Sequence, residues 1–146
     1  MKAIKIFLIP IAIMMVGCNI FGPDCSMIDP KLPLVHFKVY NEQEILLISP
    51  DGKYHPDSIS LYTKEDTLEL GFDTYHDSTL LYFYYWDHKT NDTYYLKLDN
   101  SDIDTIEIIS HTEPSECYSY QEIDTFKYNS IAFGAEPGTD IYKVIK

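Results

Sequence analysis

The chain has 146 residues, 23 acidic side chains against 11 lysines, no arginine, and a formal net charge of −12 at pH 7. This length suits one domain of ordinary size. The acidic balance and the missing arginines argue against phosphate recognition, so we expect no nucleic-acid partner. The same charge disfavours adhesion to anionic lipid headgroups.

The first expected element is a signal peptide at residues 1–17. Lys2 and Lys5 give it a basic start, and an apolar run from Ile6 to Val16 follows. The run is too short for a membrane span, which needs roughly 20 apolar residues, and it contains Pro10. This pattern predicts a cleaved export signal. Cleavage would leave nine lysines against 23 acids, a mature charge of 9 − 23 = −14.

The end of this run, Met15-Val16-Gly17-Cys18, resembles the lipobox of bacterial lipoproteins. Gly17 is the small residue at the cleavage position, and Met15 departs from the leucine usual in the family. The resemblance implies that Cys18 becomes the first mature residue and carries the lipid (palmitate). The alternative is an ordinary secreted protein that is cut elsewhere.

The resemblance also implies an address. Asn19 follows Cys18, whereas an aspartate at this place is the familiar inner-membrane retention signal, so we expect the outer membrane. Surface display usually comes with an acidic cluster just after the cysteine, and here only Asp24 is present. This favours the periplasmic face, while display on the cell surface stays open.

Residues 18–33 are expected to form a tether, because they contain several Gly and Pro residues and show no periodicity. With Cys18 assigned to the lipid, Cys25 and Cys117 remain. A cysteine pair in an oxidising compartment predicts a disulfide. Neither cysteine has a CxxC partner or a clustered histidine, so we expect no metal ion and no cofactor.

Residues 34–146 alternate between short apolar segments and polar turns. No segment of ten residues or more has a convincing helical period, and Asp-Ser/Thr turns recur before the apolar segments. The pattern predicts a single antiparallel β-sandwich of about eight strands, immunoglobulin-like or transthyretin-like. The expected strands are Leu34–Tyr40, Ile45–Ile48, Ser58–Thr63, Thr67–Phe72, Thr79–Trp86, Thr93–Leu98, Thr105–Ile109, Tyr118–Tyr128 and Ile141–Ile145.

The chain as a whole resembles the small, uncharacterised β-sandwich lipoproteins of Bacteroidota-type bacteria. The lipobox, the segment Asp102–Ile106 and the closing segment Ile141–Lys146 carry this resemblance. It implies a compartment but no activity. Several Asp-Ser/Thr-apolar triplets, such as Asp66-Thr67-Leu68, also resemble an O-glycosylation signal of these bacteria, although strand-start turns explain them equally well.

The segment Thr79–Trp86 is apolar on both faces, unlike a strand with one solvent face. If it forms a hairpin with Thr93–Leu98, the period of two assigns Leu81, Phe83, Tyr85, Tyr94, Leu96 and Leu98 to the core. The other face then carries an aromatic strip. Such a strip suits a glycan or protein ligand, unless a loop covers it. Its residues are Tyr82, Tyr84, Trp86 and Tyr95.

Other candidate sites are weaker. Asp99, Asp102 and Asp104 could offer oxygen ligands to calcium, but the glycine and distal glutamate of a calcium loop are missing. The five histidines are scattered, with no i, i+4 pair of the kind that binds zinc on a helix. We find no nucleophile elbow and no phosphate-binding glycine loop. We therefore expect Asp99, Asp102 and Asp104 to form a solvated turn and not a calcium site.

The expected function is therefore that of a lipid-anchored outer-membrane protein that acts as a non-catalytic binding or envelope-assembly module. Two alternatives stay open. One is a small envelope hydrolase acting on glycans or peptides, and the other is a structural or inhibitory lipoprotein.

Overall fold

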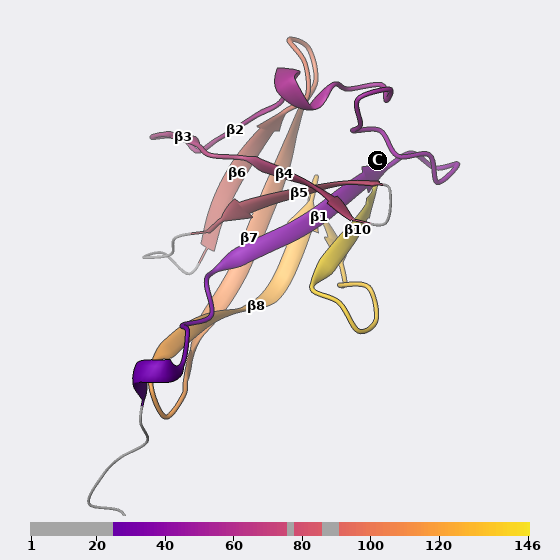
Figure 1. Ribbon diagram of the computed structural model, residues 1–146. Helices are drawn as coiled ribbons and strands as arrows, with labels where there is room; N and C mark the ends of the chain where they lie inside the picture. Colours follow the sequence, from indigo (N-terminus) through magenta and orange to yellow (C-terminus); the bar gives the residue numbers. More distant parts are fainter. Residues whose placement is uncertain (1–24, 76–77, 86–90) are drawn as a thin grey trace, which may run out of the picture.

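The computed structural model describes residues 25–75, 78–85 and 91–146, and in this part the chain is an all-β sandwich (Figure 1). This confirms the predicted fold class. None of the described residues belongs to a helix with the length and apolar character needed to cross a bilayer. The elements are η1 (Cys25–Met27), β1 (Leu34–Tyr40), η2 (Pro56–Ser58), β2 (Ser60–Tyr62), β3 (Thr67–Leu68), β4 (Gly71–Tyr75), β5 (Ser78–Tyr84), β6 (Asn91–Lys97), β7 (Ile103–Pro114), β8 (Ser119–Tyr128), β9 (Ile131–Phe133) and β10 (Ile141–Ile145).

The strands form two sheets. One has four strands in the order β10-β1-β5-β4, and the other has six in the order β3-β2-β6-β7-β8-β9. All pairs are antiparallel except β1 with β10, which run parallel, with His36 opposite Ile141. An isolated bridge between Ala135 and Tyr142 links the segment after β9 to β10. The two sheets are therefore connected on the β9–β10 side.

The core lies between the sheets and follows the period of two in each strand. In β1, Val35, Phe37 and Val39 are buried, while His36 and Lys38 point to the outer face. The ring of Phe37 lies 6.1 Å from the ring of Phe83 in its own sheet and 6.1 Å from that of Phe126 in the other sheet. Such contacts between the two sheets bury both inner faces, and the burial of this apolar surface is the main favourable contribution to the free energy of folding.

Most expected strands occur, with three corrections. Residues 45–48 form only isolated bridges, because the chain turns at Asn41, whose side chain accepts hydrogen bonds from the backbone N–H groups of Gln43 and Ile45. Residues 67–72 are divided between β3 and β4, which belong to different sheets. The short strand β9 was not predicted.

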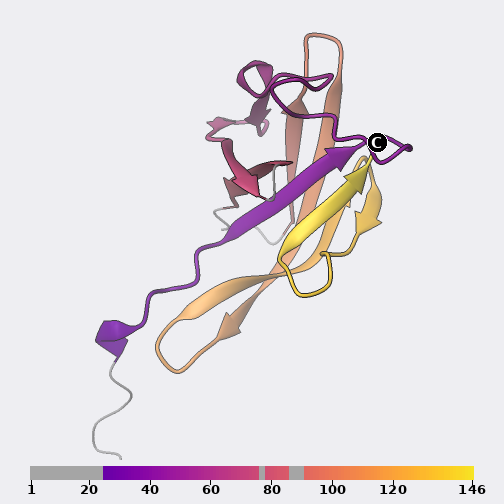
Figure 2. The same ribbon diagram turned by 45° about the vertical axis from the view of Figure 1, so that its right-hand side comes forward.

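The longest pair of strands, β7 and β8, extends beyond the rest of the sandwich as a two-stranded hairpin (Figures 1 and 2). A register shift between Ile109 and Ser110 interrupts the pairing where the hairpin leaves the sheet. Such a β-bulge bends a strand and increases its twist. The helical turn η1 lies beside the far end of this hairpin, at a distance from the core.

Candidate functional site

The predicted aromatic strip is wrong as a single surface. β5 pairs with β1 and β4, whereas β6 pairs with β2 and β7, so the two strands lie in opposite sheets and form no hairpin. Tyr95 lies on the outer face of the six-stranded sheet, where its ring stacks on that of Tyr62 at 5.4 Å. Tyr82 and Tyr84 lie on the outer face of the four-stranded sheet, and Trp86 is outside the described residues.

The inward set was nevertheless assigned correctly. Each of its six residues is 3 % exposed or less, because both strands point the same alternate residues into the sandwich from opposite sides. The period of two determines which side chains of a strand point into the core, but it does not determine which other strand is its hydrogen-bonding partner. These residues are Leu81, Phe83, Tyr85, Tyr94, Leu96 and Leu98.

The outer face of the four-stranded sheet carries the best candidate binding surface, which we call the His36 face and define by His36, Leu80, Tyr82, Asp140 and Ile141. The strand register places His36, Tyr82 and Gly71 in one row across β1, β5 and β4. The His36 and Tyr82 rings are 6.0 Å apart and inclined by 49°. Two aromatic rings from neighbouring strands thus lie side by side on a half-buried surface.

Gly71 positions the Tyr82 ring. A Cβ atom added at Gly71 would lie 2.2 Å from Cζ of Tyr82 and 2.3 Å from one of its Cε atoms. The ring therefore lies over the glycine backbone in the space that any side chain would fill. This is the cross-strand covering of a glycine by an aromatic residue that is known to fix sheet register.

A shallow groove of about 360 Å³ runs along this face. Its walls come from three strands, β1, β5 and β10, and from the loop before β10, which supplies Gly138, Thr139 and Asp140. The remaining lining residues are His36, Leu80 and Ile141. The groove thus combines apolar side chains with an imidazole, a hydroxyl and a carboxylate, a composition that suits a ligand with both apolar and hydrogen-bonding groups.

Burial lowers the pKa of His36, although the nearby carboxylates of Asp140 and Asp73 act in the opposite direction. His36 is therefore mainly neutral at pH 7, when one ring nitrogen donates a hydrogen bond and the other accepts one. Lys38 lies on the same outer face, but it is only 7 % exposed, and its Nζ donates a hydrogen bond to Oγ of Ser78 at 2.5 Å.

A second cavity, of about 380 Å³, lies next to the groove, and His36 lines both. It lies between the β1–β10 edge and the β8 strand, and the segment Lys31–Leu34 forms one side. Tyr85, Ile123 and Tyr142 supply apolar walls.

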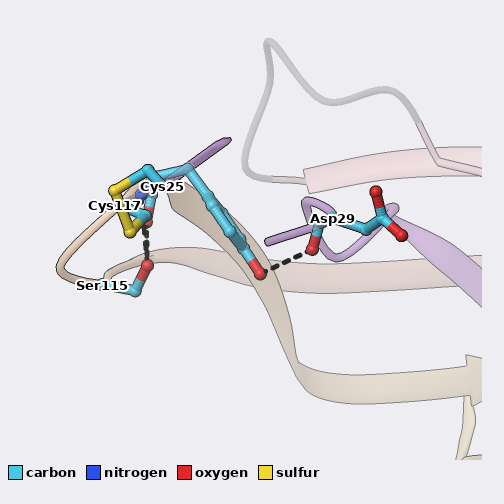
Figure 3. The surroundings of a disulfide bond; sticks show 5 residues. Cys25, Asp29, Ser115 and Cys117 are labelled. Carbon is cyan, nitrogen blue, oxygen red and sulfur yellow. Dashed lines mark hydrogen bonds between the residues drawn. A yellow bond between two sulfur atoms is a disulfide. The ribbon is translucent and has the colours of Figure 1, made fainter. Parts of the chain in front are cut away.

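The predicted disulfide is present, with Cys25 and Cys117 joined at a Cα–Cα distance of 5.3 Å (Figure 3). It attaches η1 to the loop at the far end of the β7–β8 hairpin. The Tyr118 hydroxyl donates a hydrogen bond to the carbonyl of Asp29 at 3.0 Å, and the Lys31 ammonium lies 5.2 Å from the centre of the Tyr120 ring. Residues 25–33 are therefore held along the hairpin, although the whole segment 18–33 was expected to be a tether.

The acids proposed for calcium have other partners. Oδ1 of Asp99 accepts hydrogen bonds from the backbone and the side chain of Ser101, at 2.7 and 2.9 Å. Asp102 and Asp104 each form an ion pair of 2.5 Å with Lys146. Asp102 and Asp104 thus share the single positive charge of Lys146, while Asp99 is held within its own loop. The solvated-turn alternative describes Asp99 but not the buried Asp104.

Asp102 and Asp104 belong to a half-buried cluster at the end of the sandwich opposite the disulfide. Asp104 is 4 % exposed and accepts further hydrogen bonds from Tyr128 and Asn129, at 2.5 and 2.7 Å. Burial raises the pKa of Tyr128, and its hydrogen bond to Asp104 adds to this effect. Burial alone would raise the pKa of Asp102, but its bonds to Lys146 and Tyr54 hold that pKa below the ordinary value. The cluster therefore links Lys146, which follows β10, to β7 and to Tyr128 at the end of β8.

Sequence reasoning missed His36, Gly71 and Asp140 as members of one site. They are separated by long stretches of chain, and only the order β10-β1-β5-β4 brings them together. The one local signal was the alternation in β1, which assigns His36 to the outer face.

Comparison with protein-family models, with curated proteins and with solved structures finds no match to this chain. The class of protein that the structure defines is an all-β sandwich with a grooved outer face.

Proposed function

We propose that the chain is a lipid-anchored outer-membrane protein that acts as a non-catalytic binding module, and that the His36 face binds a glycan. One observation carries the binding proposal: the Tyr82 ring, held over Gly71, lies beside the imidazole of His36, which lines a groove together with the Asp140 carboxylate. Aromatic rings with polar neighbours can stack on the apolar side of a sugar while carboxylates accept hydrogen bonds from its hydroxyl groups.

The disulfide supports the anchoring proposal in a specific way. Cys18 and Cys25 are seven positions apart in the sequence, so a lipid on Cys18 would lie within about 25 Å of the disulfide. Because the disulfide joins η1 to the far end of the β7–β8 hairpin, this end would face the membrane. The sandwich and its His36 face would then project from the bilayer, on whichever side of the outer membrane the protein lies.

Binding is tested with the soluble form of the chain against a panel of oligosaccharides and peptidoglycan fragments. We expect Tyr82→Ala and Asp140→Asn to weaken binding at least tenfold. Tyr95→Ala is the matched control, because it removes a half-buried tyrosine from the outer face of the other sheet. A thermal melt of each variant checks that it folds.

Two results would contradict the proposal. One is that no member of the panel binds the parent chain. The other is that Tyr95→Ala weakens binding as much as Tyr82→Ala does, because this would place the ligand on the opposite sheet or make the loss a consequence of general destabilisation.

A further inference from the structure

A second group of chemically active side chains lies on the β7–β8 hairpin, away from the His36 face. It consists of His111 and Glu113 on β7 and of Glu122 and Asp124 on β8. His111 is directly opposite Glu122 in the strand register. Glu113 is two residues along the strand from His111 and shares its face. Paired strands, rather than a loop, therefore set the spacing of these side chains.

The β-bulge supplies the fourth member of the group. Ile109 is opposite Thr125 and Ser110 is opposite Ile123, so Asp124 is the extra residue of β8. A bulge turns a side chain out of the regular alternation. Here Oδ1 of Asp124 lies 2.9 Å from Nδ1 of His111, within hydrogen-bond distance. When Nδ1 carries the ring proton and donates it to Asp124, the lone pair of Nε2 is available to a ligand.

The other nitrogen faces carboxylates. Nε2 of His111 is 3.4 Å from Oε2 of Glu113. His111, Glu113 and Glu122 each offer one ligand atom, and these three atoms lie within 4.8 Å of one another. Bond lengths of about 2.0–2.1 Å and a tetrahedral angle separate two ligands of a zinc ion by about 3.3 Å. The spacing of Nε2 and Oε2 is close to this value.

The group has an excess of acidic over basic side chains, which favours the binding of a cation. It contains three carboxylates and one imidazole, and in the described part of the chain no lysine forms an ion pair with any of the three acids. The side chains of His111, Glu113 and Asp124 are each between 44 and 47 % exposed, so an ion can enter from solvent. When His111 is protonated, it is itself the cation that pairs with Glu113 and Asp124, and a metal ion bound between the acids would replace that ring proton.

We propose that this group is a binding site for a divalent transition-metal ion of the Zn²⁺ class. Nε2 of His111 and the carboxylates of Glu113 and Glu122 are the ligands, and solvent completes the coordination. Asp124 is a positioning residue that orients the imidazole, as carboxylates do in many histidine–zinc sites. The imidazole ligand selects a transition metal over Ca²⁺, which takes oxygen ligands. This site is independent of the proposed glycan-binding face.

The test is calorimetric titration of the full-length chain with Zn²⁺, in a Cys18→Ser background so that no free thiol competes. We expect binding of one ion per chain, loss of binding in His111→Ala, and affinity about 10–100-fold weaker in Asp124→Asn. His55→Ala is the matched control, because His55 also lies beside an aspartate, Asp57, at 3.6 Å, but outside this group. It should leave the affinity unchanged.

Circular dichroism of each variant checks that the hairpin and the sandwich remain folded, so a lost signal reports the ligand and not the fold. The proposal is overturned if the parent chain binds no Zn²⁺ at micromolar concentration, or if His111→Ala binds it as tightly as the parent does. Equal or tighter binding of Ca²⁺ by the parent would also overturn it, because that result would assign the site to the carboxylates alone.

Discussion

At the scale of single residues, the ion pairs of Lys146 differ sharply from those at the surface. Lys146 binds both Asp102 and Asp104, and Asp104 is almost fully buried. The pair between Lys143 and Glu44 is exposed, with Glu44 72 % accessible. Removing one member of a buried pair leaves a charge without compensation, whereas an exposed pair contributes little.

This contrast predicts the effect of Lys146→Met, which removes the ammonium group and keeps much of the side-chain volume. We expect the free energy of unfolding to fall by about 3–5 kcal/mol, because Asp104 then stays buried without a cation. Lys143→Met is the control and should change the free energy of unfolding far less, because its partner Glu44 is exposed to solvent. Urea denaturation of both variants measures the difference, and equal effects would show that burial does not strengthen the Lys146 pairs.

At the scale of elements, β5 illustrates how one strand serves two surfaces. Its buried residues Leu81 and Phe83 pack between the sheets, while Tyr82 and Tyr84 lie half-buried on the outer face. Leu80, also on the outer face, is only 6 % exposed and lines the groove. A strand with one freely solvated face would carry polar residues on that face. β5 is apolar on both faces because its outer side is half-buried and forms part of the candidate site.

The alternation in β5 predicts unequal effects of two neighbouring truncations. Phe83→Ala should lower the free energy of unfolding by about 3–5 kcal/mol, because Phe83 is fully buried and contacts the ring of Tyr94 at 4.9 Å across the sandwich. Tyr84→Ala should lower it by about 1 kcal/mol, because its side chain lies on the half-buried outer face. Thermal or urea denaturation of the two variants measures both effects. If Tyr84→Ala lowers the stability more than Phe83→Ala does, the inward assignment of Phe83 is wrong.

At the scale of the whole molecule, the disulfide joins Cys25 and Cys117, which are 92 positions apart in the sequence. In the chain-entropy model, closing a loop of this size stabilises the folded state by about 4–5 kcal/mol. It also connects η1, next to the proposed anchor, to the end of the hairpin that lies farthest from the core. The same bond thus adds stability and defines the direction in which an anchored sandwich would point.

The proposed anchoring would depend on Cys18, which is outside the described residues. We expect a fatty-acid analogue supplied to cells to label the parent chain, and Cys18→Ser to abolish the label and release the protein from the membrane fraction. Cys25→Ser is the control that separates lipidation from disulfide formation, because it should keep the label. Undiminished labelling of Cys18→Ser would contradict the assignment.

The sequence by itself determined the secondary-structure class, most strand positions, the inward residues of β5 and β6, and the Cys25–Cys117 pair. These follow from local physical rules: a period of two, turn-forming residues, and the chemistry of paired cysteines. It could not determine that β5 and β6 lie in opposite sheets. Either arrangement buries the same apolar side chains, so the pattern of burial is silent about the hydrogen-bonding partner.

Only the tertiary structure decided which residues share a surface. It separated Tyr95 from Tyr82 and brought His36, Gly71 and Asp140 together through the strand order of one sheet. It also placed Asp124 beside His111, because a β-bulge shifted the register by one residue. The physical reason is that strand pairing is non-local: its free energy depends on how whole sheets pack, and no short segment of the sequence contains that information.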